Sequence, residues 1–117
     1  MQPLQIGRAG ECVARAYLGE RGWRIHDANW HCRYGEIDLV ASRGTVLAFI
    51  EVKTRTSTAH GHPLEAITAR KLARLRRLSA AWLASHEHEP PEIRLDLIAI
   101  LAPRSGPVRL EHVRGIG

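Results

Sequence analysis

The chain has few cysteines and no long hydrophobic run, and these two scarcities exclude several classes of protein. Its 117 residues include only two cysteines, Cys12 and Cys32, which form no Cys-x-x-Cys pair. Two cysteines are too few for a disulfide framework, so we expect both to be reduced and buried. No apolar stretch approaches the roughly 20 residues that span a bilayer, and the first residues lack the hydrophobic core of a secretion signal. We therefore expect a cytoplasmic protein without a membrane partner.

The sequence also lacks internal repeats and low-complexity segments. Hydrophobic residues make up 44% and charged residues 25% of the chain, which is ordinary for a globular domain. Its length suits one domain over residues 1–117, with room for a sheet and a few covering helices. The 17 lysines and arginines exceed the 12 acids and give a net charge of +5. This bias favours a polyanionic partner such as nucleic acid, although charge alone does not choose the partner.

The hydrophobic pattern predicts an α/β fold in the order helix, three strands, helix, two strands. The expected elements are a helix over 8–20, a strand from Trp23 through the connection 27–34, a hairpin with arms 35–41 and 46–53 around the turn 42–45, a helix over 64–82, and strands over 93–101 and 108–113. The first helix should bury a stripe of Ala9, Val13, Ala16 and Tyr17. We expect a mixed central sheet flanked by helices.

The hairpin carries Asp38, Glu51 and Lys53 inside runs of apolar residues. Ionisable side chains are costly to bury unless they are paired, bound to metal or used in chemistry. Two carboxylates suit Mg²⁺ or Mn²⁺, because hard ions prefer oxygen ligands and Mg²⁺ typically uses one or two protein carboxylates with substrate phosphate. Lys53 could then orient the attacking water or stabilise negative charge. The alternative is a structural ion pair between Lys53 and either acid.

The register of the hairpin decides whether the two acids meet. A turn centred between Arg43 and Gly44 places Asp38 opposite Phe49, and diagonal to Glu51 at roughly 7 to 8 Å between Cα atoms. Side chains alternate between the faces of a strand. One face should therefore hold Glu36, Asp38, Val40, Leu47, Phe49, Glu51 and Lys53. The other should be an uninterrupted apolar face of Ile37, Leu39, Ala41, Val46, Ala48, Ile50 and Val52.

Two segments of this hairpin resemble a nuclease signature. The pattern I-D followed by E-V-K is similar to the PD-(D/E)xK motif, with isoleucine in place of the motif's proline. GEIDLVA and FIEVKTR at this spacing resemble more closely the small bacterial YraN-like family of predicted nucleases, which is related in fold to archaeal Holliday junction resolvases. The resemblance covers most of the chain, including GRAGECVARAYL, Asn29, HPLEAI, residues 71–75 and LDLI.

This resemblance implies a restriction-endonuclease-like fold and a Mg²⁺-dependent nuclease acting on DNA, including branched or structured DNA. It implies that Asp38 and Glu51 bind metal, that Lys53 assists catalysis, and that Glu11 supplies a further acid. From the helical pattern alone, a surface glutamate paired with Arg8 or Arg15 is the more common explanation of Glu11. The rival functions are a non-catalytic nucleic-acid-binding module and a subunit that docks a protein partner. RNA is not excluded, and a homodimer would allow both strands of a duplex to be cut.

Basic residues gather on the helix expected over 64–82 and after the hairpin. The candidates for contact with backbone phosphates are Arg55, Arg70, Lys71, Arg74, Arg76 and Arg77. The alternative interpretations are a solvated helix face and, for Arg55, a flexible connector.

The histidines and tryptophans complete the set of candidates. The pairs His60-x-His62 and His86-x-His88 suggest zinc, but they lack further ligands at suitable spacing, which favours loop histidines. Trp82 continues an apolar helical stripe and is expected in the core. Trp30 is expected in a loop, where it could stack on a base.

Overall fold

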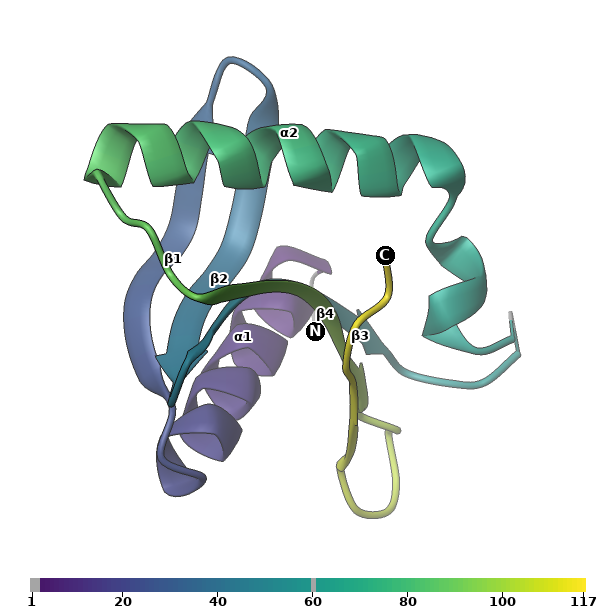
Figure 1. Ribbon diagram of the computed structural model, residues 1–117. Helices are drawn as coiled ribbons and strands as arrows, with labels where there is room; N and C mark the ends of the chain where they lie inside the picture. The colour runs from purple at the N-terminus through teal and green to yellow at the C-terminus, as the bar shows by residue number, and fades with distance from the viewer. Residues whose placement is uncertain (1–2, 60) are drawn as a thin grey trace.

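The computed structural model describes residues 3–59 and 61–117, in which five strands and two long helices follow one another in the predicted order (Figure 1). Its elements are α1 (Pro3–Glu20), β1 (Arg24–Cys32), β2 (Gly35–Arg43), β3 (Val46–Arg55), a short 3₁₀ helix η1 (Pro63–Ala66), α2 (Ala69–His86), β4 (Glu92–Leu101) and β5 (Arg109–Val113). The strands form one sheet in the order β1-β2-β3-β4-β5, in which β3 and β4 are parallel and the other pairs antiparallel. The mixed α/β architecture is confirmed.

The two helices cover opposite faces of the sheet, and each buries its own hydrophobic cluster (Figure 1). On the α1 face the buried residues are Ala14, Leu18, Trp23, Leu39, Ala41, Ala48, Ile50, Ile98 and Ile100. On the α2 face they are Ile37, Val40, Leu47, Phe49, Leu75, Leu78, Trp82 and Leu95. Trp82 lies in the core, as predicted, with its ring 5.7 Å from that of Phe49. In the described part of the chain, neither helix combines the length and the apolar character needed to cross a membrane.

Several predicted details of the first helix and strand are wrong. The helix α1 begins at Pro3 rather than at residue 8, and its buried side is Gly10, Ala14 and Leu18, whereas Ala9 and Ala16 are exposed. A run of small apolar residues leaves the helix phase ambiguous by about one position. The segment 27–34 is mostly strand, because β1 runs from Arg24 to Cys32, with a shift in its pairing register between Ile25 and Asp27.

The cysteines and Trp30 also differ from expectation. Cys12 is exposed and Cys32 is partly buried, so the expectation that both are buried is wrong, although both are free thiols. Trp30 lies on β1 rather than in a loop, and packs partly against the α2 cluster.

The helix predicted over 64–82 is divided in two. Pro63–Ala66 form η1, and α2 begins only after Thr68, whose side chain accepts a hydrogen bond from the Lys71 N–H at 3.1 Å. This cap satisfies an N–H group that has no partner within the helix, so it fixes the helix start at Ala69. The helix then continues past Trp82 to His86, where Glu87 takes a left-handed conformation.

The hairpin register differs from the predicted one by two residues. The strand β2 continues to Arg43, which pairs with Val46, so the turn is only Gly44-Thr45. Val40 therefore faces Phe49, whereas the predicted register placed Asp38 there. A shift of two residues preserves the alternation of faces, so most of the face assignments remain correct.

Ile37 is the exception to this alternation. It packs in the α2 cluster, whereas Leu39 belongs to the α1 cluster. The neighbouring strand changes face at the same level, because Ala28 packs on the α1 side and Trp30 on the α2 side. Between them, Asn29 has a left-handed φ of 53°. The predicted uninterrupted apolar face is therefore wrong at Ile37.

A buried polar network joins β4, β5 and α1. Asp96 is fully buried and accepts hydrogen bonds from Arg94 at 2.8 and 3.0 Å, from His112 Nε2 at 2.7 Å and from the Gly115 N–H at 3.0 Å. Tyr17 Oη lies 3.0 Å from His112 Nδ1. Burial alone would raise the pKa of Asp96, but the hydrogen bonds from His112 and Arg94 outweigh it and hold the pKa below its usual range. This aspartate is therefore a fully matched structural charge.

The close approach of α1 to β3 depends on a glycine and yields a stability prediction. A Cβ at Gly10 would overlap with Thr54 Oγ1 and lie 3.0 Å from Thr54 Cβ, so rotation of the threonine would not remove the contact. We expect Gly10→Ala to lower the free energy of unfolding by roughly 1 to 3 kcal/mol. Gly19→Ala is the control, because its Cβ meets no atom within 4 Å. It should stabilise α1 by up to about 1 kcal/mol. Urea unfolding measures both, and equal stabilisation by the two variants would contradict the close contact.

Candidate functional site

The strands β2 and β3 separate at Asp38. Their pairing extends from Arg43–Val46 to Leu39–Ile50, and beyond that pair the backbone N–H of Val52 donates to Asp38 Oδ2 at 2.7 Å. A carboxylate thus holds the main chain of β3 where the ladder of backbone hydrogen bonds ends. We call this point, made by Asp38, Glu51 and Val52, the fork.

Glu51 and Lys53 lie on the face of the sheet that α2 covers. The register between β3 and β4 is unbroken from Val46 to Arg55, so side chains on β3 alternate without interruption. Phe49 packs against α2, which places Glu51, Lys53 and Arg55 on the same face.

The two acids of the fork are half-buried, and the pKa of each is raised. Burial, with the nearby negative charge of Glu51 adding to it, raises the pKa of Asp38 to about 7, against a smaller opposing effect of the Val52 N–H. Burial also raises the pKa of Glu51, while the positive charges of Lys53, Lys71 and Arg74 oppose the rise. The hydrogen bonds and positive charges around Asp38 and Glu51 therefore do not offset the cost of burying their charged forms.

The fork contains oxygen donors without an ion pair to neutralise them. Among the described residues, none of Asp38, Glu51 and Lys53 forms an ion pair within 4.0 Å, so the alternative of a structural pair is not observed. A hollow of about 20 Å³, room for about one water molecule, lies between Glu51 and the α2 residues Lys71 and Arg74. Two carboxylates fit the small number of protein ligands that Mg²⁺ typically uses.

Glu11 approaches the fork from α1, held by an asparagine. Asn29 Nδ2 donates to the two carboxylate oxygens of Glu11 at 2.7 and 2.9 Å, and no ion pair joins Glu11 to Arg8 or Arg15 in the part of the chain described. The negative charge of Glu11 makes a small contribution to the raised pKa of Asp38. Sequence reasoning assigned Asn29 no role of its own; its tolerance of a left-handed backbone was the available signal.

Glu11, Asp38 and Glu51 are not assembled as a three-acid cage. Across residues 3–59 and 61–117, no three His, Cys, Asp or Glu side chains are arranged to hold a metal ion. Metal binding by these acids, and by Glu11 in particular, therefore stays a prediction.

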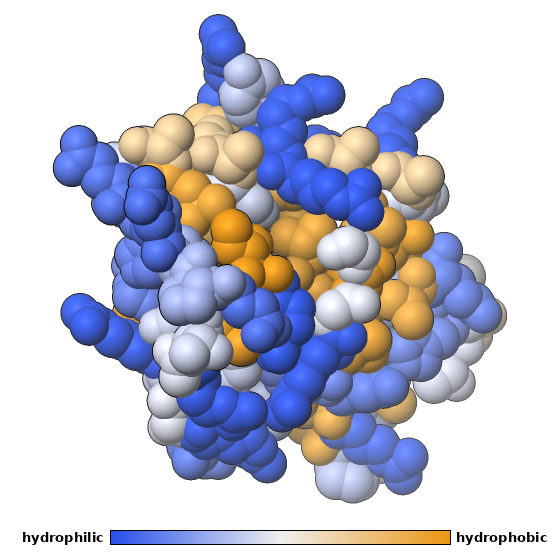
Figure 2. Space-filling model, viewed as in Figure 1, coloured by the Kyte–Doolittle hydropathy of each residue, from blue (hydrophilic) through white to orange (hydrophobic). Residues whose placement is uncertain are grey.

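The cationic residues of α2 lie beside the fork and extend away from it. Arg70, Arg74, Arg76 and Arg77 are exposed and Lys71 is half-buried. Hydrophilic side chains project from the α2 edge around a more apolar centre (Figure 2).

The turn between β1 and β2 extends this cationic surface. The Arg77 guanidinium lies 5.6 Å from the ring centre of Tyr34, and that of Arg33 lies 4.8 Å from it. Sequence reasoning missed Arg33, because the contact depends on the turn lying against α2.

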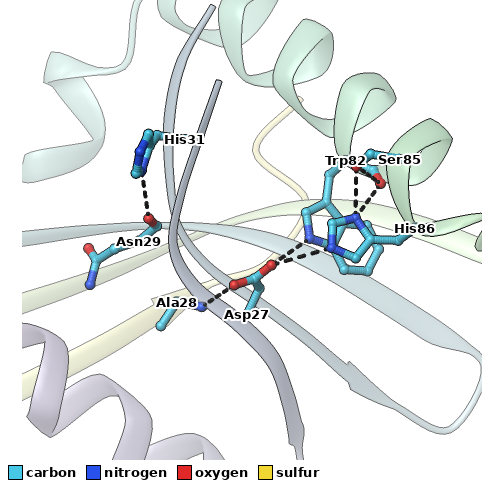
Figure 3. A network of polar contacts seen from close by, with 7 residues as sticks. All are labelled: Asp27, Ala28, Asn29, His31, Trp82, Ser85 and His86. Carbon is cyan, nitrogen blue, oxygen red and sulfur yellow. Dashed lines mark hydrogen bonds and ion pairs between the residues drawn. The ribbon is translucent and has the colours of Figure 1, made fainter. Parts of the chain in front are cut away.

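His86, from the second histidine pair, contacts Trp82 and Asp27 (Figure 3). His86 is the last residue of α2 rather than a loop residue; it stacks on Trp82 at 4.1 Å, and its Nε2 lies 3.5 Å from Asp27 Oδ2. Asp27 Oδ2 also accepts from Trp82 Nε1 at 3.2 Å, which joins β1 to the end of α2. His88 lies beside His26, with ring centres 5.7 Å apart.

The other histidine pair is only partly described. His62 Nε2 lies 2.6 Å from Glu111 Oε1, which joins the start of η1 to β5. His60 lies outside the described residues.

In the comparison with known proteins, the family model and the relatives reported below carry the same family description. The family described as "Uncharacterised protein family UPF0102" matches residues 10–100. A UPF0102 protein of Beutenbergia cavernae is 53% identical over 112 residues, covering 96% of this chain and 95% of the relative. A UPF0102 protein of Arthrobacter sp. is 51% identical with the same coverage. One of Frankia casuarinae is 50% identical over 110 residues, or 94% and 93% of the two chains. The match includes every residue of the fork.

The raised pKa of Asp38 predicts an unusual dependence of stability on pH. As pH rises from about 4 to about 7, the unfolded chain loses the Asp38 proton while the folded protein keeps it, so the free energy of unfolding falls. We expect Asp38→Asn in EDTA to be more stable than wild type at pH 8, by at most about 4 kcal/mol, with the gap smallest near pH 4. Urea unfolding across this range measures it. Glu20→Gln, at an exposed carboxylate, is the control, and a less stable Asp38→Asn at pH 8 would contradict the charge assignment.

Proposed function

The chain belongs to the uncharacterised protein family UPF0102, and we propose that it is a metal-dependent nuclease of the PD-(D/E)xK, YraN-like type that hydrolyses phosphodiester bonds in DNA. The observation that carries this proposal is the fork. There Asp38 and Glu51 are half-buried together, with no ion pair to either acid within residues 3–59 and 61–117, and Lys53 lies on the face of Glu51. Partly buried acids with raised pKa values are typical of functional sites. A divalent cation would stabilise both in their charged form.

Each residue of the fork has a role in this proposal. Asp38 and Glu51 would hold Mg²⁺ or Mn²⁺, which when bound polarises a phosphate and lowers the pKa of a bound water. The hydrogen bond from the Val52 N–H fixes the direction of the Asp38 carboxylate. Lys53 orients the attacking water or stabilises the negative charge that develops on the phosphate. Glu11, held by Asn29, is the further acid on the α1 side.

The cationic side chains next to the fork support a polyanionic substrate. The positive charges of Lys71 and Arg74 favour the charged form of Glu51. Arg70 and Arg77 extend the same positive surface along α2. A phosphate backbone approaching two acids needs such compensation, because the acids alone would repel it. The net charge of +5 acts in the same direction.

The proposal predicts metal-dependent cleavage. Purified protein incubated with single-stranded, duplex and branched DNA should cleave in Mg²⁺ or Mn²⁺ and not in EDTA. Asp38→Asn and Glu51→Gln should each lower the cleavage rate at least about a hundredfold, because each removes a charge from the metal site. Lys53→Met should lower the rate without abolishing metal binding, measured as thermal stabilisation by Mn²⁺.

Two outcomes would decide against the enzyme. Salt-sensitive DNA binding without cleavage in any metal would indicate the binding module, and binding to no nucleic acid would indicate the docking subunit. Glu20→Gln, an exposed acid at the end of α1, is the matched control and should retain full activity.

The cationic surface of α2 predicts the salt dependence of DNA binding. Arg70→Ala/Arg74→Ala should weaken binding similarly for all sequences. It should also reduce the slope of log affinity against log salt concentration by about 1 for each phosphate that the two arginines neutralise in the wild type. Arg104→Ala removes an exposed arginine between β4 and β5 and is the control. An unchanged slope in the double variant would mean that this face does not bind phosphate.

A further inference from the structure

A groove of about 510 Å³ opens beyond the fork, at the end of β3. Its walls include Arg55 of β3, Ala99 and Leu101 of β4, Arg109 and Glu111 of β5, and His62. The segment after β3 extends beyond the sheet before η1 leads the chain back to α2 (Figure 1). The lining residues Ser57, Thr58, Gly61 and His62 place the groove between this segment and the ends of β3, β4 and β5. Its volume is in the range of small-molecule sites.

The groove continues the face of the sheet that carries Glu51 and Lys53. Lys53 is in register with Ala99, and Ala99 with Glu111, so Lys53 lies in the same cross-strand row as two residues that line the groove. One row further, Arg55 and Arg109 lie on either side of Leu101, about 10 Å apart by strand spacing. In-register neighbours share a face. A nucleic-acid strand with a phosphate at the fork can therefore continue directly over the groove.

The charges around the groove favour a phosphate. Glu111, the one carboxylate among the described lining residues, lies 2.6 Å from His62 Nε2. The N–H of Leu64 donates to His62 Nδ1 at 3.0 Å, so in the neutral ring the proton is on Nε2 and is donated to Glu111. Neither Arg55 nor Arg109 forms an ion pair within 4.0 Å in the described part of the chain. Two guanidinium groups therefore remain available to an anion.

The floor of the groove is apolar. Its ligand should therefore offer an apolar surface as well as a negative charge. Ala99, Leu101 and Pro63 supply hydrocarbon surface to the groove, and Leu101 lies between the two arginines. A nucleotide combines a phosphate with a flat apolar face, and bases stack readily on apolar side chains and guanidinium planes. A base inside a duplex is paired and stacked, and reaches such a surface only when it is unpaired or flipped.

We propose that this groove binds one unpaired nucleotide next to the scissile phosphate, its base on the apolar floor and its phosphate between Arg55 and Arg109. The inference rests on the proposed nuclease function, because it assigns the neighbouring nucleotide of the same substrate strand. It narrows the substrate class to DNA with a single-stranded segment, such as a tail or a flap, in place of continuous duplex.

Fluorescence anisotropy tests the proposal with two labelled DNA hairpins of the same stem, one blunt and one with an unpaired tail. Wild-type protein is measured in EDTA, and the Asp38→Asn variant is measured in Mg²⁺. We expect the tailed DNA to bind about tenfold more tightly, and a tail with abasic sugars to lose this preference. Arg55→Ala/Arg109→Ala should reduce the affinity for tailed DNA about tenfold, whereas Arg104→Ala should not. The abasic tail tests the groove in an unaltered protein, so the test does not depend on how the double variant folds.

The outcomes separate this inference from the nuclease proposal. Metal-dependent cleavage, combined with equal binding of blunt, tailed and abasic DNA, would overturn the groove and leave the nuclease standing. A preference for the tail that the abasic sugars abolish, without cleavage in any metal, would support the groove as a binding site and overturn the nuclease. Binding of no DNA under either condition would overturn both.

Discussion

The hydrogen bond from the Val52 N–H to the Asp38 carboxylate is the interaction on which the candidate site depends. It occurs where the pairing of β2 with β3 ends, so a side chain takes over from the backbone in holding the two strands together. A carboxylate in this position is fixed in direction but still has oxygen lone pairs to offer. Because Glu51 follows on the α2 face of β3, the separation of the strands brings a second acid beside the first. The irregularity of the sheet and the chemistry of the site are thus one feature.

Both helices contribute to holding the fork in place. On one side, Gly10 allows α1 to lie against Thr54, and the next residue, Glu11, reaches Asn29. On the other side, α2 buries Trp82 against Phe49, and one turn of the same helix directs Lys71 and Arg74 toward Glu51. Apolar packing therefore fixes the positions of charged groups that would not approach one another by their own attraction. The sheet supplies the acids, and the helices determine which charges surround them.

The sequence predicted the order of the elements and the face of Glu51 and Lys53, because both follow from alternation along regular strands. The predicted hairpin register was wrong by two residues. Most of the predicted face assignments were still correct, because an even shift preserves the alternation of side chains between the faces. Ile37 could not be placed, since its change of face accompanies the left-handed Asn29 on the neighbouring strand. The contacts of Asp96 with His112, and of His62 with Glu111, could not be predicted from the sequence either. Each joins segments that only the folded sheet brings together.

Asp96 and Asp38 are buried to different degrees in the same sheet, and their pKa values are shifted in opposite directions. Asp96 is fully buried, yet Arg94, His112 and the Gly115 N–H satisfy its charge and hold its pKa low, so it stabilises the fold as an ion. In the described part of the chain, Asp38 receives one hydrogen bond, and with Glu51 nearby its pKa is raised to about 7. A fold selected for stability alone would gain by matching Asp38 as it matches Asp96. We therefore propose that the charge of Asp38 is left for a partner outside the chain, and two carboxylates at one fork suit a divalent cation.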